Sequence, residues 1–144
     1  MNKLDPHSLF SIFEKGDEEV YKEHGQEDLL QNPFVLMGMV LRGLDNFKLM
    51  SMLYMKNYPK EFKEVQPTVK FKFYNKLYRY LERININKLE SIYTIGDSFD
   101  NKNVCDSLDE LIYYFQGIEH YEKCAKILKY KELLVDEYIK NLIK

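Results

Sequence analysis

The residue types that most often carry catalysis or bind metals are few in this sequence and widely spaced. The three histidines, His7, His24 and His120, are never four residues apart, and the two cysteines, Cys105 and Cys124, form no Cys-x-x-Cys pair. Zinc sites are usually built from such pairs. A nucleophilic cysteine needs a positively charged, accessible setting, whereas the residues around Cys124 predict a helix crossing. We therefore expect no metal site, no cofactor and no catalytic residue.

The phosphate-binding and hydrolase motifs are also missing from the sequence. There is no Gly-x-Gly-x-x-Gly, Walker-type loop, Gly-x-Ser-x-Gly or His-Glu-x-x-His run, and the six glycines stand where helices are expected to end or turn. Catalysis by residues assembled from distant parts of the chain is an alternative that no motif search tests. The sequence favours binding over chemistry.

Charge is segregated along the chain, although the formal net charge is only −2. Residues 47 to 88 have 10 basic and 3 acidic side chains, whereas residues 1 to 46 have 4 and 9. Residues 89 to 122 have 1 basic and 8 acidic side chains, and residues 123 to 144 have 6 and 3. A basic segment therefore lies between two acidic ones.

The basic segment, residues 47 to 88, also contains nine of the aromatic residues. On the helix expected there, four basic residues recur at spacings of four, three and four and should share one face: Lys72, Lys76, Arg79 and Arg83. We call these four the basic face and predict that, with Tyr78, they contact a partner. An acidic protein or the acidic segments of the same chain would suit this face. The alternative is single-stranded nucleic acid, since cations neutralise phosphates and aromatic rings stack on bases.

Length and composition indicate one domain. A chain of 144 residues with 45% hydrophobic residues can enclose a single core. The longest apolar run, residues 34 to 41, is shorter than the roughly 20 residues that cross a bilayer. No secretory signal stands at the first residues, and two cysteines do not make a disulfide framework. We expect a single helical domain over residues 1 to 144, without membrane contact, in the cytoplasm.

Start and stop signals divide the first half of the chain into short helices. A helix over about 6 to 15 is expected after Asp5, and a second should run from Asp17 to Gly25. Asn32 before Pro33 is the clearest start signal and predicts a buried helix. A break at Gly43 would divide this stretch, down to Pro59, into a helical hairpin.

The second half continues the helical pattern. Pro67 is expected to open a long helix with an apolar stripe at Val69, Phe73, Leu77, Leu81 and Ile84. The alternation from Val69 to Phe73 would also suit a strand, but the stripe is too long for one. Asn87 with Glu90 predicts a brief helix through Tyr93, followed by a polar loop over residues 96 to 103.

The last helices complete an all-α prediction. Ser107 with Glu110 resembles a capping box and should start a helix that Gly117 stops, before a final helix that contains Tyr121. The sequence thus predicts an irregular bundle of about seven short helices. It should end in an antiparallel helical hairpin at about residues 106 to 142.

This hairpin carries the pattern of a known motif. Leu108 and Ile112 are four residues apart, and the next helix contains the run Tyr121-Glu122-Lys123-Cys124-Ala125-Lys126-Ile127. Residues 108 to 134 therefore resemble the UVR helical hairpin of bacterial excision-repair proteins, which has an aromatic residue, a glutamate and two small residues in this order. Two positions depart from the family: Leu128-Lys129 replaces its arginine and aspartate, and Phe115-Gln116 replaces paired small residues.

The resemblance implies a hairpin that contacts proteins and carries no chemistry. We take Tyr121 and Glu122 as its contact residues. An unrelated antiparallel helix pair with small residues at its crossing point would show the same residues. Both interpretations place a helix contact at Cys124.

These features are typical of an adaptor or regulator that binds another macromolecule, most readily a protein. Its oligomeric state is open. Five clustered methionines should mostly be core, with the excess on an outer face available to a partner: Met37, Met39, Met50, Met52 and Met55. The abundance of Lys, Ile, Asn and Tyr suits an AT-rich genome, such as that of a phage or of a low-GC bacterium.

Overall fold

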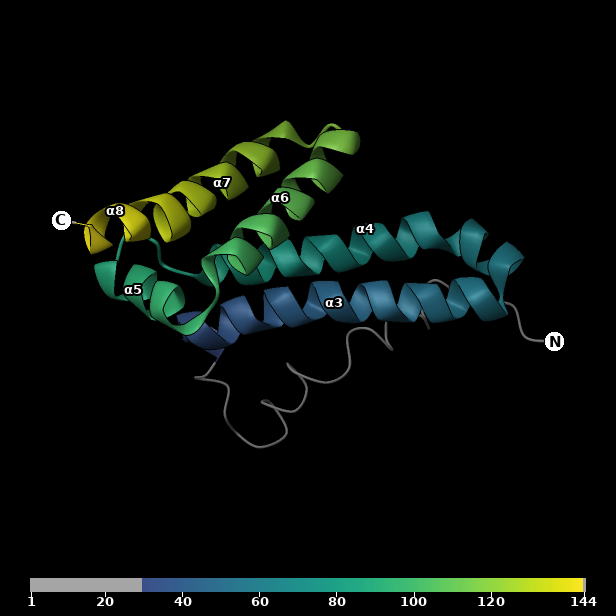
Figure 1. The fold of residues 1–144 in the computed structure, drawn as a ribbon. Helices are drawn as coiled ribbons and strands as arrows, with labels where there is room; N and C mark the ends of the chain where they lie inside the picture. Colours follow the sequence, from purple (N-terminus) through teal and green to yellow (C-terminus); the bar gives the residue numbers. More distant parts are fainter. Residues whose placement is uncertain (1–29, 144) are drawn as a thin grey trace.

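The computed structural model describes residues 30 to 143, which form helices and contain no strand (Figure 1). The all-α prediction is confirmed for this part of the chain, including residues 69 to 73. The helices predicted over residues 6 to 15 and from Asp17 to Gly25 lie outside the described residues. Between residues 30 and 143, no helix is both long enough and apolar enough to cross a bilayer.

Two long antiparallel helices form the base of the bundle. Helix α3 spans Pro33–Asn57 and helix α4 spans Pro59–Arg83, so Tyr58 alone separates them. Phe47 of α3 stacks on Phe73 of α4 with ring centroids 5.2 Å apart. Figure 1 shows that α3 and α4 extend beyond the other helices at the end where they are joined.

The N-terminus of α3 forms where the sequence predicts it, because Asn32 caps it. The Asn32 Oδ1 accepts hydrogen bonds from the backbone N–H groups of Phe34, at 2.8 Å, and Val35, at 3.4 Å. The predicted break at Gly43 is wrong. A Cβ at Gly43 would lie 2.6 Å from the Leu77 Cδ2 of α4, so the glycine allows α3 and α4 to approach closely. Helix α3 continues through Gly43 to Asn57.

The predicted helix start at Pro67 is also wrong. Helix α4 begins at Pro59, and Pro67 lies inside it. A proline in a helix interior removes one backbone hydrogen bond and costs about 3 kcal/mol. The buried side chains Val65 and Val69 on either side of Pro67 pack in the core, and this burial offsets the cost. The predicted apolar stripe from Val69 to Ile84 is confirmed, since all five of its residues are buried.

Helix α5 spans Leu89–Ser98 and is longer than predicted. Its N-cap is Lys88 instead of Asn87, and the expected loop after Tyr93 is helical as far as Ser98. Gly96 lies within α5, where a Cβ would overlap the ring of Tyr138. The glycine is therefore needed for close packing of α5 against the C-terminal helix.

Helix α6 spans Asn101–Gly117, so the predicted start near Ser107 is wrong. Asp100 is the N-cap, and its Oδ2 accepts a hydrogen bond from the Asn103 N–H at 3.2 Å. Ser107 is buried in the helix interior. The predicted stop at Gly117 is confirmed.

The chain then returns along α6 and α4. Helix α7 spans Tyr121–Lys131 and continues without a break into the π-helical segment η2, Glu132–Glu137, and helix α8, Tyr138–Leu142. Helix α7 packs on α6, whereas η2 and α8 pack on α5 (Figure 1). The described residues thus form five continuous helices. The first two are longer than predicted, because Gly43 does not divide α3 and α4 begins before Pro67.

Candidate interaction surfaces

The basic face is only partly exposed. Arg79 and Arg83 lie at the surface of α4, Lys72 is half-buried, and Lys76 is only 6% exposed. The Lys76 Nζ lies 5.8 Å from the centroid of the Tyr80 ring. The spacing of these residues on one helix is as predicted, but tertiary packing covers Lys76. The four residues of the basic face therefore do not form a continuous exposed surface, because Lys76 is buried.

Most aromatic residues of the basic segment belong to the core. Six of the nine are buried: Phe47, Phe62, Phe73, Tyr74, Tyr78 and Tyr80. The Tyr78 ring lies edge-on to Phe115 with centroids 5.7 Å apart, and burial raises the pKa of its hydroxyl. The predicted contact residue Tyr78 is thus a packing residue. Tyr58 and Phe71 are the exposed aromatic residues of this segment.

Helix α7 covers one polar side of α4. The Lys126 Nζ lies 2.6 Å from the Glu82 carboxylate, and Lys123 donates to the Asn75 side chain. The Lys123 Nζ also lies 5.4 Å from the centroid of the Tyr78 ring. These side-chain contacts connect α7 to α4, so one face of α7 points away from both α4 and α6.

That outer face carries exposed apolar and aromatic side chains. We call it the α7 surface, and it consists of Tyr121, Glu122, Ala125 and Leu128 of α7, together with Ile118, which follows α6. Tyr121 is 60% exposed, Leu128 is 45% exposed, and Glu122 and Ala125 are exposed too. Positions 121, 125 and 128 recur at helical spacing and therefore share one side of α7. The predicted contact residues Tyr121 and Glu122 both lie on this surface.

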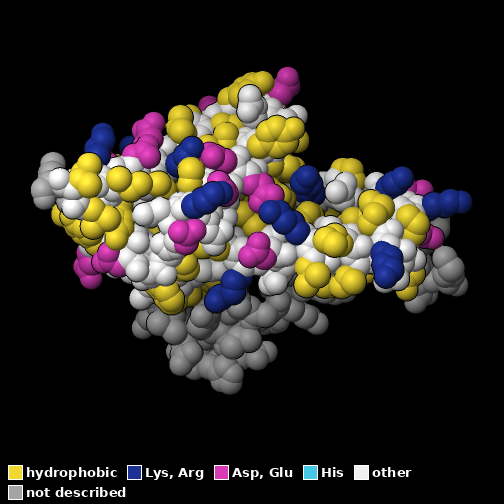
Figure 2. All heavy atoms as spheres, viewed as in Figure 1, with side chains coloured by type: hydrophobic (Ala, Val, Ile, Leu, Met, Phe, Trp, Pro, Cys, Tyr) yellow, Lys and Arg dark blue, Asp and Glu magenta, His cyan; other side chains and the backbone are white. Residues whose placement is uncertain are grey.

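A second exposed apolar strip lies on the outer side of α3. Leu49, Met52 and Leu53 are three and four residues apart, and Met52 is 69% exposed. Figure 2 shows hydrophobic and basic side chains over the end of α3 and α4 that extends beyond the other helices. The methionine prediction holds in part, since Met37 and Met39 are buried while Met52 faces solvent. Leu49 and Leu53 gave no sequence signal, because their exposure depends on which helices pack against α3 and not on the local pattern.

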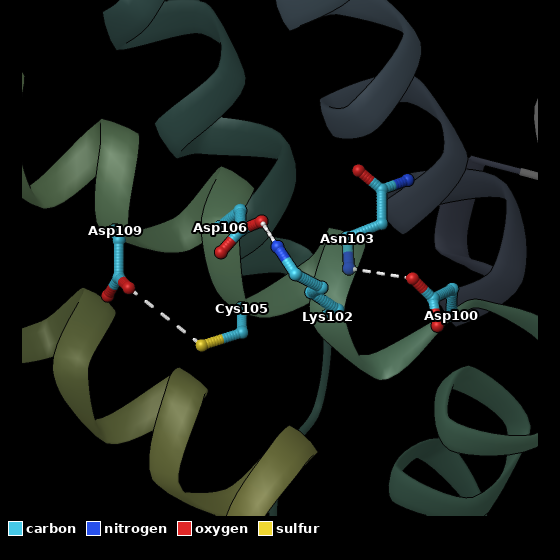
Figure 3. A network of polar contacts seen from close by, with 6 residues as sticks. All are labelled: Asp100, Lys102, Asn103, Cys105, Asp106 and Asp109. Carbon is cyan, nitrogen blue, oxygen red and sulfur yellow. Dashed lines mark hydrogen bonds and ion pairs between the residues drawn. The ribbon is translucent and has the colours of Figure 1, made fainter.

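A polar network at the start of α6 contains groups that ligate metals elsewhere (Figure 3). Cys105, Asp106 and Asp109 offer three ligand atoms within 4.8 Å of one another. Each carboxylate is already paired with an ammonium group, because Lys102 lies 2.9 Å from Asp106 and Lys131 lies 2.8 Å from Asp109. A cation would have to displace both lysines. We therefore interpret the cluster as a stabilising network and assign it no metal.

The two remaining candidates for chemistry have packing roles. The His120 ring lies against the rings of Phe71 and Phe115, with centroids 5.9 Å and 6.2 Å away. The Cys124 Sγ donates to the Ile112 carbonyl at 3.4 Å, which places this thiol at the contact between α6 and α7. The predicted helix contact at Cys124 is therefore present.

The Cys124 thiol should react slowly in the folded protein. Burial raises the pKa of this thiol, so at pH 8 a smaller fraction of it is thiolate than in a free cysteine. Because the thiolate is the reactive form, alkylation of Cys124 should become faster only at higher pH. We expect iodoacetamide to modify Cys124 at least several-fold more slowly in the native chain than in urea, measured by peptide mass spectrometry. Equal rates in both conditions would contradict this placement.

The sequence predicted some of the exposed residues on these surfaces and missed others. Sequence reasoning found Tyr121 and Glu122, which the structure exposes, and Arg79 and Arg83, which lie apart from them on α4. It missed Leu128, which it placed within the last helix without recognising that this residue lies on the exposed side.

The comparisons with known proteins do not assign the chain to a family. No family model matches this chain, and no curated protein or solved structure is significantly similar to it.

Proposed function

We propose that this chain is a non-enzymatic adaptor or regulator that binds a protein partner through the α7 surface. The observation that carries the proposal is the exposure of Tyr121 and Leu128 on one side of a helix that contacts α6 through Cys124 and α4 through Lys126. Tyrosine is enriched at the energetic centres of interfaces, because it adds large apolar area and one polar group at low entropic cost.

The rigid setting of α7 supports this function. Cys124 faces α6 and Lys126 faces α4, so the helix does not need to reorganise to present Tyr121. A preorganised surface loses little conformational entropy on binding. Ala125, between Tyr121 and Leu128, leaves room for a side chain of the partner. The resemblance of residues 108 to 134 to the UVR hairpin points to the same role.

The proposal is tested by purifying the tagged full-length chain from its native host and identifying bound proteins by mass spectrometry. We expect one protein in near-equal molar amount. The complex should survive raised salt, because apolar contacts are not screened by ions. Purification of the chain alone, after crosslinking as well as without it, would count against the proposal.

Single-stranded nucleic-acid binding is the second candidate, and the exposed Arg79, Arg83 and Phe71 favour it. If this function holds, binding measured by fluorescence anisotropy at low salt should weaken steeply as salt rises. The double variant Arg79→Glu/Arg83→Glu should then lose binding, whereas Lys102→Glu/Lys140→Glu should retain it. The absence of binding at low salt would remove this candidate. The burial of most aromatic residues of segment 47 to 88 leaves few rings for stacking, so we favour the protein partner.

A further inference from the structure

We infer that a hollow beside the loop after α4 binds the phosphate group of a phosphorylated ligand. The hollow has a volume of about 400 Å³ and lies between residues 82 to 87 and α7. This volume is within the range of small-molecule sites. Its lining is Glu82, Arg83, Ile84, Asn85, Ile86, Asn87, Lys126, Lys129 and Tyr130. The inference does not depend on the α7 surface or on a protein partner.

The charge of the lining is strongly positive. Three of its side chains are cations, Arg83, Lys126 and Lys129, and one is an anion, Glu82. The Glu82 carboxylate is engaged by Lys126 at 2.6 Å, so its charge is locally compensated. Arg83 and Lys129 remain for an anion. A guanidinium and an ammonium that line the same hollow suit a phosphate dianion, since arginine can bind two of its oxygens and lysine adds a point charge.

The walls of the hollow are held in place. The Arg83 guanidinium lies 5.8 Å from the centroid of the Tyr80 ring, a contact that restrains the arginine side chain. The Tyr130 hydroxyl lies 3.2 Å from the Glu82 carbonyl oxygen and 3.3 Å from that of Ile84, so α7 fixes the start of the loop. These contacts reduce the entropy that the site would lose on binding.

The asparagines add neutral donors. The Asn85 Oδ1 accepts a hydrogen bond from the Asn87 N–H at 3.0 Å, which leaves the Asn85 amide NH₂ group as a donor. Ile84 and Ile86 supply apolar surface beside these polar groups. The arrangement therefore suits a phosphate monoester with a small organic group attached.

Binding is tested by thermal unfolding of the full-length chain. Inorganic phosphate and a nucleoside monophosphate should each raise the Tm in a concentration-dependent way, compared with chloride at equal ionic strength, because a ligand that binds only the folded state stabilises it. The variant Arg83→Ala/Lys129→Ala should weaken phosphate binding at least about tenfold. The matched control Lys102→Ala/Lys140→Ala removes the same charge elsewhere and should respond like the wild type.

NMR provides a second readout that does not depend on stability. Phosphate should shift the backbone amide signals of residues 83 to 87 and 126 to 130 in the wild type, and the nucleoside monophosphate should shift the same signals. A phosphotyrosine peptide, compared with its unphosphorylated form, tests a modified protein as the source of the phosphate. Binding of the nucleoside monophosphate or of the phosphotyrosine peptide supports the site if that binding requires Arg83 and Lys129. Equal responses of the wild type and the Arg83→Ala/Lys129→Ala variant, or no response to phosphate, would overturn it.

Discussion

Replacing Gly96 by alanine is expected to destabilise the fold by about 3 kcal/mol, at the upper end of the cost of overpacking a core. A Cβ at Gly96 would overlap three atoms of the Tyr138 ring. The ring cannot swing aside easily, because it is buried and its hydroxyl donates to the Asp97 Oδ1 at 2.6 Å. Either α5 must move away from α8 or Tyr138 must leave its rotamer.

The chain offers a matched control for this substitution. Gly117 also lies in a helix, as the last residue of α6, but a Cβ there would meet nothing within 4 Å. Gly117→Ala should change the free energy of unfolding by less than about 1 kcal/mol, with stabilisation the expected sign. Urea unfolding of both variants and the wild type measures the difference. If Gly96→Ala were as stable as Gly117→Ala, the packing of α5 on α8 would be wrong.

The two glycines show what a single sequence predicts about this fold and what it does not. Asn32 and Gly117 mark helix ends through local chemistry, a side-chain cap in one case and the low helix propensity of glycine in the other, and both were predictable. Gly43 and Gly96 lie inside helices because another helix approaches them closely. That approach depends on residues far away in the sequence, and a local pattern carries no sign of it.

The same distinction separates the site residues. Lys76 belongs with Lys72 and Arg79 by spacing, yet the fold covers it, since spacing gives the side of a helix and not what packs on it. Tyr78 is buried for the same reason. Tyr121 lies on the exposed side of the last helix, as expected of a contact residue. The π-helical segment η2 had no sequence signal that we recognise.

Replacing Tyr121 and Leu128 together by alanine is expected to weaken partner binding by about 2 to 4 kcal/mol, which is a loss of roughly thirtyfold to several hundredfold in affinity. Both side chains would be buried in the complex, and a tyrosine at the centre of an interface often contributes most of its energy. The fold itself should be almost unaffected, because exposed residues usually change stability by no more than about 0.5 kcal/mol.

The control variant is Leu89→Ala/Ile139→Ala. Both residues are large, apolar and exposed, at 58% and 43%, and they lie on α5 and α8 instead of the α7 surface. This pair removes a similar amount of exposed apolar area. It therefore separates a general loss of non-specific apolar contacts from the loss of a specific interface.

Quantitative affinity purification of the three full-length chains from the native host, with circular dichroism to verify their folding, is the most direct measurement. We predict that the wild type and Leu89→Ala/Ile139→Ala recover the same protein partner in near-equal molar amount. At a partner concentration no higher than the wild-type Kd, Tyr121→Ala/Leu128→Ala should recover less than about a tenth of it, as follows from a loss of affinity of about thirtyfold or more. Equal recovery by all three folded chains would contradict a role for the α7 surface. Recovery of no partner by any of them would contradict the proposed function.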